Sequence, residues 1–174
     1  GACVRICAHD GPSITNGKAF IDHAKCVGCG RCLAVCPVDA IEPGSGASVL
    51  MLNRKIAEYS LAVCQNRPCF HISLILDVSP NCDCHAENDI PIIPNVGMLA
   101  SFDPVALDVA CADLCNAMPV MAGSVLSDNL RQEDPAHAGY DAFQMTHPDT
   151  EWKSCIEHAV KIGLGNSDYE LIRI

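Results

Sequence analysis

The chain has 174 residues, a formal net charge of −10, thirteen cysteines and 49% hydrophobic residues. The acidic charge makes nucleic acid and anionic membranes poor partners, and no stretch approaches the roughly 20 apolar residues of a membrane-spanning helix. Secreted disulfide-rich domains are shorter and poorer in aliphatic residues, so the cysteines indicate a reducing cytoplasm, and the length suits one domain with a small module beside it.

The N-terminal residues match a later stretch of the chain. Residues 1–7 read Gly-Ala-Cys-Val-Arg-Ile-Cys, and residues 30–36 read Gly-Arg-Cys-Leu-Ala-Val-Cys. Both follow the pattern Gly-x-Cys-x3-Cys, which we interpret as an internal repeat whose first copy has lost its front half. A complete first copy would carry two more cysteines just before Gly1. We therefore expect the chain to be the C-terminal piece of a longer protein. The missing N-terminal part of that protein would then be one of the binding partners of this chain.

Residues 26–37 contain the strongest motif, Cys-Val-Gly-Cys-Gly-Arg-Cys-Leu-Ala-Val-Cys-Pro. The spacing C-x2-C-x2-C-x3-C-P is typical of a cubane iron–sulfur cluster, because three thiolates must reach three corners of one small cube from a tight loop. Gly28 and Gly30 let this loop curl and let backbone N–H groups face the sulfides. Pro37 turns the chain away. A structural zinc site is the alternative, although zinc motifs usually pair two C-x2-C units at longer separation.

The repeat resembles the two-cluster bacterial ferredoxin module over residues 1–42. In such modules the fourth cysteine of each run ligates the other cluster. The resemblance implies one complete [4Fe–4S] site, with the ligands Cys7, Cys26, Cys29 and Cys32. It also implies half of a second site, with the ligands Cys3 and Cys36. The chain departs from the module at Ala8, where a proline usually follows the cysteine.

The remaining elements of the first part follow from turn signals. Residues 8–17 are expected to be a polar connector that ends in a turn at Asn16-Gly17. Residues 18–23 are expected to form a short strand that leads into the cysteine loop. Each half-repeat should form a loop, a short helix and a strand. Pro43-Gly44-Ser45-Gly46 is a linker that separates a ferredoxin-like module, residues 1–43, from part of an α/β domain, residues 47–174.

The second part mixes helical and strand patterns. Helices are expected over 47–66, over 103–117 with Ser101 or Asp103 as N-cap, and over 152–162. The apolar run over 70–78 predicts a central strand covered on both faces, and further strands are expected over 96–99 and 169–174. Residues 119–148 are expected to be irregular. The fold class is therefore α+β or α/β, with a ferredoxin-like iron–sulfur module followed by the C-terminal part of an α/β sandwich domain.

Polar residues follow directly after the predicted strand 70–78, where α/β sheets place their sites. Cys82, Cys84 and His85 are candidate ligands for a soft metal, and Asp77, Asp83 and His85 are candidates for proton transfer. The alternative is a turn with buried thiols. His71, Cys111, Cys115 and Cys155 are interpreted as structural or packing residues.

Residues 81–85 (Asn-Cys-Asp-Cys-His) and residues 91–108, which contain the pattern Ser-x-Asp-Pro-x-Ala-x-Asp, resemble the uncharacterised iron–sulfur centre proteins of domain-of-unknown-function family 362. The resemblance covers roughly residues 1–118 and the last helix and strand. It implies that a two-cluster ferredoxin segment interrupts a larger α/β domain, half of which precedes Gly1. It supplies no reaction.

Three functions remain open. The first is an electron-transfer protein, or a redox-enzyme fragment, that carries a [4Fe–4S] cluster and docks a redox partner protein. The second is a redox enzyme with an additional metal or substrate site at residues 82–85. The third is a structural or sensory iron–sulfur or zinc module. Whether the chain is an enzyme is left open.

Overall fold

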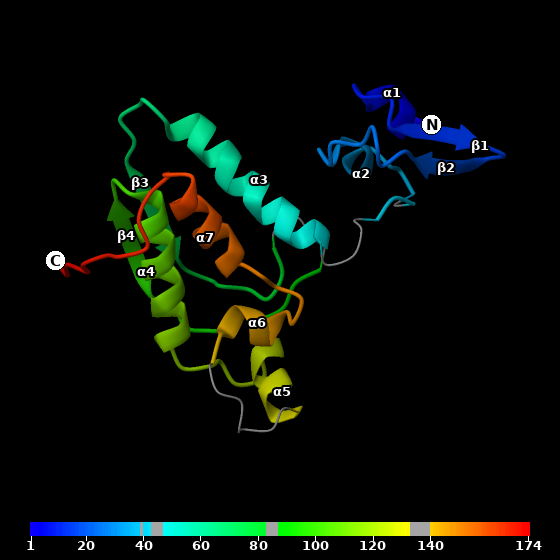
Figure 1. The fold of residues 1–174 in the computed structure, drawn as a ribbon. Coiled ribbons are helices and arrows are strands. Elements are labelled where there is room, and N and C mark those ends of the chain that lie inside the picture. Colours follow the sequence, from blue (N-terminus) through cyan, green and yellow to red (C-terminus); the bar gives the residue numbers. More distant parts are fainter. Residues whose placement is uncertain (39, 43–46, 83–86, 133–139) are drawn as a thin grey trace. The chain divides into compact units, whose positions relative to one another are not determined.

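The computed structural model describes residues 1–38, 40–42, 47–82, 87–132 and 140–174 (Figure 1). The chain divides into two compact units, Gly1–Ser48 and Val49–Ile174. Both combine helices with a two-stranded antiparallel sheet, so the protein is of mixed α/β type. Among the described residues, no helix has the length and apolar character needed to cross a membrane.

The N-terminal unit consists of two short helices and a β-hairpin. Its elements are α1 (Ala2–Ile6), β1 (Pro12–Thr15), β2 (Lys18–Ile21) and α2 (Arg31–Ala34). β1 and β2 pair through the predicted turn, where Asn16 and Gly17 have φ values of 53° and 75°. Two successive positive φ values are those of a type I′ turn, whose twist matches that of the flanking strands.

Two expectations for this unit change. Residues 8–17 were expected to be a connector, but Pro12–Thr15 form β1, because the tight turn places them beside β2. The first half-repeat has a strand after its helix, whereas residues 35–38 and 40–42, which follow α2, form none. Among the described residues of the unit only three are buried, namely Cys3, Gly11 and Pro12. The unit therefore has very little hydrophobic core.

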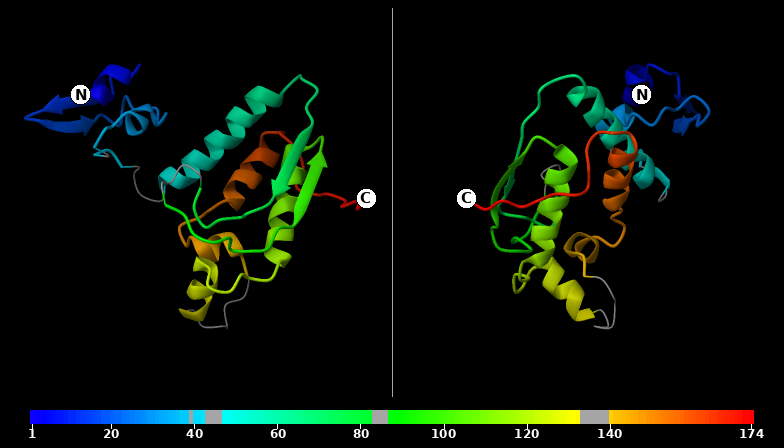
Figure 2. Two further views of the ribbon diagram at one scale, coloured as in Figure 1. Left: turned by 180° about the vertical axis from the view of Figure 1, so that it is seen from behind. Right: turned by 60° about the vertical axis from the view of Figure 1, so that its left-hand side comes forward.

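The C-terminal unit is built from five helices and the strand pair β3–β4 within its described residues. The elements are α3 (Ala47–Cys64, which begins at the unit boundary), β3 (His71–Ile75), β4 (Gly97–Ser101), α4 (Pro104–Ala117), α5 (Val125–Gln132), α6 (Ala142–Thr146) and α7 (Lys153–Lys161). β3 and β4 are antiparallel, with His71 opposite Ser101 and Ile75 opposite Gly97. Helix α4 packs against both strands and against α7 (Figure 2).

The expectation of a central strand covered on both faces is wrong for β3. Its side chains alternate, with Ile75 buried and Ile72 and Leu74 exposed by 60% and 63%. The single helix layer covers one face, and an apolar run cannot show from sequence how many faces are covered. Residues 169–174, expected as a strand, form no strand or helix.

The segment expected to be irregular contains α5 and α6, each of which contributes a residue to the larger hydrophobic cluster. That cluster consists of Ile75, Ile92, Ile93, Cys115, Leu126 and Ala142. Helix α6 begins at Asp141, whose carboxylate accepts the N–H groups of Phe143 and Gln144 at 3.1 and 3.2 Å. The same buried carboxylate accepts the indole N–H of Trp152 at 3.0 Å. A buried capping residue thus joins α6 to the start of α7.

Helix α4 begins where the sequence predicts. The carboxylate of Asp103 caps it by accepting the N–H groups of Val105 and Ala106 at 2.9 and 3.0 Å, and Pro104 occupies the first helical position. The other carboxylate oxygen accepts the N–H of Asn166 at 2.8 Å. A Cβ atom added to Gly165 would collide with this carboxylate. Asp103 therefore fixes both the helix and the segment that follows α7.

Candidate metal centres

The structure brings four of the predicted ligands around one pocket in the N-terminal unit. Cys7 directly follows α1, Cys26 and Cys29 lie on the loop after β2, and Cys32 lies in α2; all four line the pocket. The other lining residues are His9, Gly11, Pro12, Ile21, Val27, Gly30 and Arg31. Segments from both half-repeats therefore supply thiols to the same pocket.

The loop that carries Cys26 and Cys29 is shaped by Asp22 and two glycines. The carbonyl oxygen of Asp22 accepts the N–H of Cys26 at 2.9 Å, and its side chain accepts the N–H of Ala24 at 3.0 Å. Gly28 and Gly30 have φ values of 68° and 74°, a backbone conformation that side chains with a Cβ rarely adopt. The tight curl expected from these glycines is therefore observed.

Backbone N–H groups point at sulfur atoms in this unit. The N–H of His9 donates to Sγ of Cys7 at 3.4 Å, and the N–H of Ala40 donates to Sγ of Cys36 at 3.3 Å. Such donors favour a thiolate, the form that binds metals, and hydrogen bonds to sulfur tune iron–sulfur clusters. The donor set and its surroundings thus suit a thiolate-bound cofactor.

Cys3 and Cys36, the predicted half of a second cluster, do not line this pocket. Cys3 is buried on α1, and Cys36 is half-buried just beyond α2. The two helices pack against each other within the unit. Two thiols are too few for a cubane, so their role as cluster ligands stays a prediction.

The predicted site after β3 is described only in part. Asp83, Cys84 and His85 lie outside the described residues, while Cys82 is exposed. Asp77 has a φ of 48°, and its backbone N–H donates to Oδ1 of Asn95 at 2.7 Å. The loop on either side of residues 83–86 is held by hydrogen bonds between Ser79, Asn81 and Asn88. Metal binding or proton transfer at this site stays a prediction.

A different group of possible metal ligands lies in the C-terminal unit. Cys64, Cys69 and His71 each offer one ligand atom, and these atoms all lie within 4.8 Å of one another. Among the described residues, Nε2 of His71 is the one buried side-chain nitrogen or oxygen without a hydrogen-bond partner. From sequence His71 is interpreted as structural, and neither Cys64 nor Cys69 is predicted to be a ligand. The spacing C-x4-C-x-H was the available signal.

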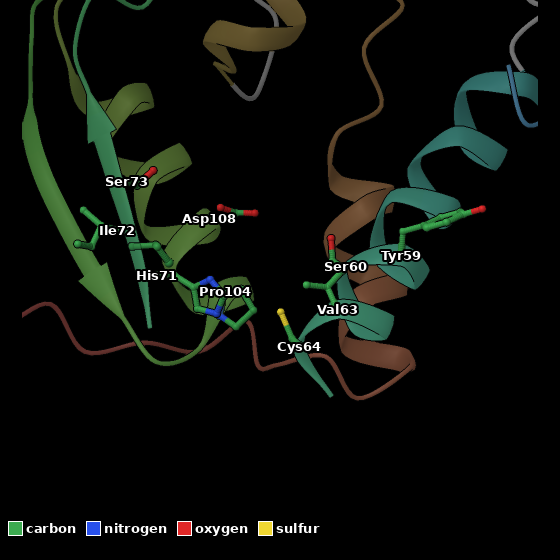
Figure 3. Close-up of a pocket in the computed structure, with 10 residues that line it drawn as sticks. Tyr59, Ser60, Val63, Cys64, His71, Ile72, Ser73, Pro104 and Asp108 are labelled. Atoms are coloured by element: carbon green, nitrogen blue, oxygen red, sulfur yellow. The ribbon is translucent and has the colours of Figure 1, made fainter. Parts of the chain in front are cut away.

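Cys64 and His71 of this group line a pocket with a volume of about 500 Å³ (Figure 3). The side chains of Cys64, His71 and Asp108 point into the space between α3 and the β3–α4 side of the unit. The pKa of the Cys64 thiol is raised, mainly because the group is partly buried. The hydrogen bond with Cys69 and the proximity of that second thiol raise it further. Partial burial also raises the pKa of Asp108, although His71 opposes that shift.

The cysteines of α4 agree with the packing interpretation. Cys115 belongs to the hydrophobic cluster, and burial, assisted by the nearby Cys111, raises its thiol pKa to about 11. Burial likewise raises the pKa of Cys111. Both thiols therefore remain protonated at neutral pH and behave as small apolar side chains.

Comparison with known proteins adds one family. The model of a family described as "Domain of unknown function (DUF362)" matches residues 5–113, which is more than half of the chain and includes both candidate centres. No curated protein and no solved structure matches the chain. Thirteen cysteines and a possible ligand group at Cys64, Cys69 and His71 are compatible with a metal-binding protein.

Proposed function

The chain belongs to the DUF362 family, and from the chemistry of its own residues we propose that it is an iron–sulfur electron-transfer protein or a redox-enzyme fragment. The N-terminal unit is a ferredoxin-like module, and Cys7, Cys26, Cys29 and Cys32 hold one [4Fe–4S] cluster. When bound, such a cluster accepts and donates single electrons. The observation that carries this proposal is that these four thiols line one pocket.

The surrounding residues suit this role in three ways. The C-x2-C-x2-C spacing supplies three thiols from one loop, while Cys7 approaches from the other half-repeat. The left-handed conformations of Gly28 and Gly30 allow that loop to bend tightly around a compact group. The backbone N–H of His9 donates a hydrogen bond to Sγ of Cys7. A single ion bound by two separate C-x2-C pairs would need a different spacing.

The proposal also includes a partner. Cys26 and Cys29 are exposed, so electrons can enter and leave at the protein surface. The chain has a net charge of −10, which favours docking to a protein with a basic surface. A redox partner of this kind should bind more weakly as ionic strength rises, because salt screens surface charges.

The test is anaerobic reconstitution of the full chain with iron and sulfide. We expect about four irons and four sulfides per chain, and an EPR signal after reduction. Cys29→Ala should abolish both. The matched control is Cys155→Ala, a cysteine on α7 of the other unit, which should retain both.

Two results would contradict the proposal. Stoichiometric zinc with negligible iron would leave a structural metal module. A cluster that assembles but exchanges no electrons with a ferredoxin or flavodoxin would favour a structural or sensory role.

A further inference from the structure

The second ligand group is formed where helix α3 turns into strand β3. The helix ends at Cys64, and the chain reverses through Asn66, whose φ of 60° is left-handed. The N–H of Arg67 donates to the carbonyl oxygen of Cys64 at 3.2 Å, which closes the turn. Sγ of Cys69 lies 3.8 Å from the same carbonyl oxygen. This reversal returns Cys69 to the helix end that carries Cys64.

The third ligand is held by the sheet. His71 is the first residue of β3 and pairs with Ser101 of β4, so its backbone position is fixed by strand pairing. Because side chains alternate along a strand, His71 lies on the covered face together with Ser73 and Ile75. The end of α3, the start of β3 and the segment between them therefore present three soft or borderline ligands to one point.

The spacing of the ligand atoms suits a single ion. In a tetrahedral zinc site with bonds of about 2.0–2.3 Å, ligand atoms are separated by roughly 3.3–3.8 Å. The three atoms here lie within 4.8 Å of one another, so movements of about an ångström would close the site. Such movements are available to Cys64 and Cys69, which flank a turn on the surface.

An independent observation is that Nε2 of His71 is buried without a hydrogen-bond partner. Buried imidazole nitrogens normally have a partner, because leaving one unsatisfied is unfavourable. Coordination to a metal would satisfy this nitrogen. The cysteine sulfur atoms at hand are weak hydrogen-bond partners but good metal ligands.

We propose that Cys64, Cys69 and His71 bind one zinc ion whose fourth coordination position faces the 500 Å³ pocket. Two thiolates and an imidazole are ligands that zinc prefers, and three protein ligands with one open position are typical of catalytic rather than structural zinc sites. Asp108, from α4, lines the pocket and interacts electrostatically with His71. It is the positioning residue for a fourth ligand, such as water. This site is separate from the proposed cluster and goes beyond the electron-transfer function.

The site can be measured in the full chain after its N-terminal cysteines are loaded with iron and sulfide. We expect one tightly bound zinc per chain beyond the iron, counted by elemental analysis. Replacing zinc with Co²⁺ should give the intense visible absorption of a tetrahedral thiolate site. Cys64→Ser, Cys69→Ser and His71→Ala should each lose this equivalent of zinc while the iron content stays unchanged.

The cobalt spectrum also distinguishes ligands from supporting residues. Loss of one thiolate in Cys69→Ser should roughly halve the sulfur-to-cobalt charge-transfer band in any cobalt that is retained. Asp108→Asn should keep the ion and both thiolates but shift the d–d bands. The control Cys155→Ala should change neither the zinc content nor the spectrum, because Cys155 lies outside the ligand group.

Several outcomes would overturn the proposal. One is an unchanged zinc content in Cys64→Ser and Cys69→Ser variants that unfold at the same urea concentration as the parent. Another is a Cys64–Cys69 disulfide in protein handled without oxygen, detected by mass spectrometry. Uptake of iron instead of zinc by this ligand group would also reject it. Iron and zinc are counted separately. Absence of zinc at Cys64, Cys69 and His71 would therefore leave the electron-transfer proposal intact, and absence of an iron–sulfur cluster would leave the zinc proposal intact.

Discussion

The two units carry similar metal-ligating side chains on very different supports. In the N-terminal unit only Cys3, Gly11 and Pro12 are buried among the described residues, and four cysteines line its pocket. The C-terminal unit has a hydrophobic cluster around Leu126 and Ile93, both of which are 0% exposed. Its candidate metal ligands lie at the end of α3, at the start of β3 and on the segment between them.

The comparison indicates what holds each unit together. A unit with so little buried apolar surface gains little from the hydrophobic effect, so a bound metal or cluster would supply much of its folding free energy. The C-terminal unit buries enough apolar residues to fold around its own core, and a metal there would add to an existing structure.

The largest effect is expected from Cys29→Ala, which removes one of the four thiols that line the N-terminal pocket. Metal binding in small metal-dependent folds contributes about 10–16 kcal/mol, so the N-terminal unit should unfold while the C-terminal unit stays folded. Hydrogen exchange read by mass spectrometry should show lost protection in β1 and β2 and unchanged protection in α4. Persistent protection of the β1–β2 hairpin would mean that packing alone holds this unit. Cys155→Ala is the control.

An intermediate effect is expected from Leu126→Ala in the core of the C-terminal unit. Leu126 is completely buried, so the substitution should lower the free energy of unfolding by about 2–5 kcal/mol. Urea unfolding can be followed through Trp152, which is the single tryptophan and packs edge-to-face with Phe143. The matched control is Leu52→Ala, which removes a leucine side chain that is 59% exposed and should cost well under 1 kcal/mol.

An effect of the Leu126→Ala substitution on the N-terminal unit would contradict the difference between the two units. If Leu126→Ala also reduced the iron content of the reconstituted protein, the two units would not fold independently.

The smallest effect concerns the N-cap of α4. Partial burial favours the protonated form of Asp103, but hydrogen bonds from Ala106, Asn166 and Val105 outweigh it and lower the pKa of this carboxyl. A lowered native pKa stabilises the protein above the ordinary aspartate pKa of about 3.9, and this stabilisation is lost as the pH falls below that value.

Asp103→Asn keeps a side-chain cap but removes the charge. We expect it to cost on the order of 1 kcal/mol at pH 7 and close to nothing at pH 2–3. Urea midpoints measured across this pH range provide the test, with exposed Asp149→Asn as the control. An equal loss at both pH values would show that the charge of Asp103 does not stabilise the native state.

The sequence by itself determined the features that depend on local chemistry. The spacing of Cys26, Cys29 and Cys32 predicted ligands on one tight loop, and the glycines between them have the left-handed conformation expected. Asp103 followed by Pro104 predicted the start of α4, because a cap and a proline at the first position act within one turn. The family resemblance also came from such contiguous residues.

Only the tertiary structure decided which residues meet and which faces are covered. β3 has one exposed apolar face because helix α4 covers only the other, and no run of apolar residues reveals how many layers surround it. Residues 125–132 and 142–146 form helices whose residues contribute to the core. Cys64, Cys69 and His71 converge because α3 stops at Cys64 and β3 starts at His71, and those boundaries are set by a left-handed turn and by pairing with a strand about thirty residues away in sequence.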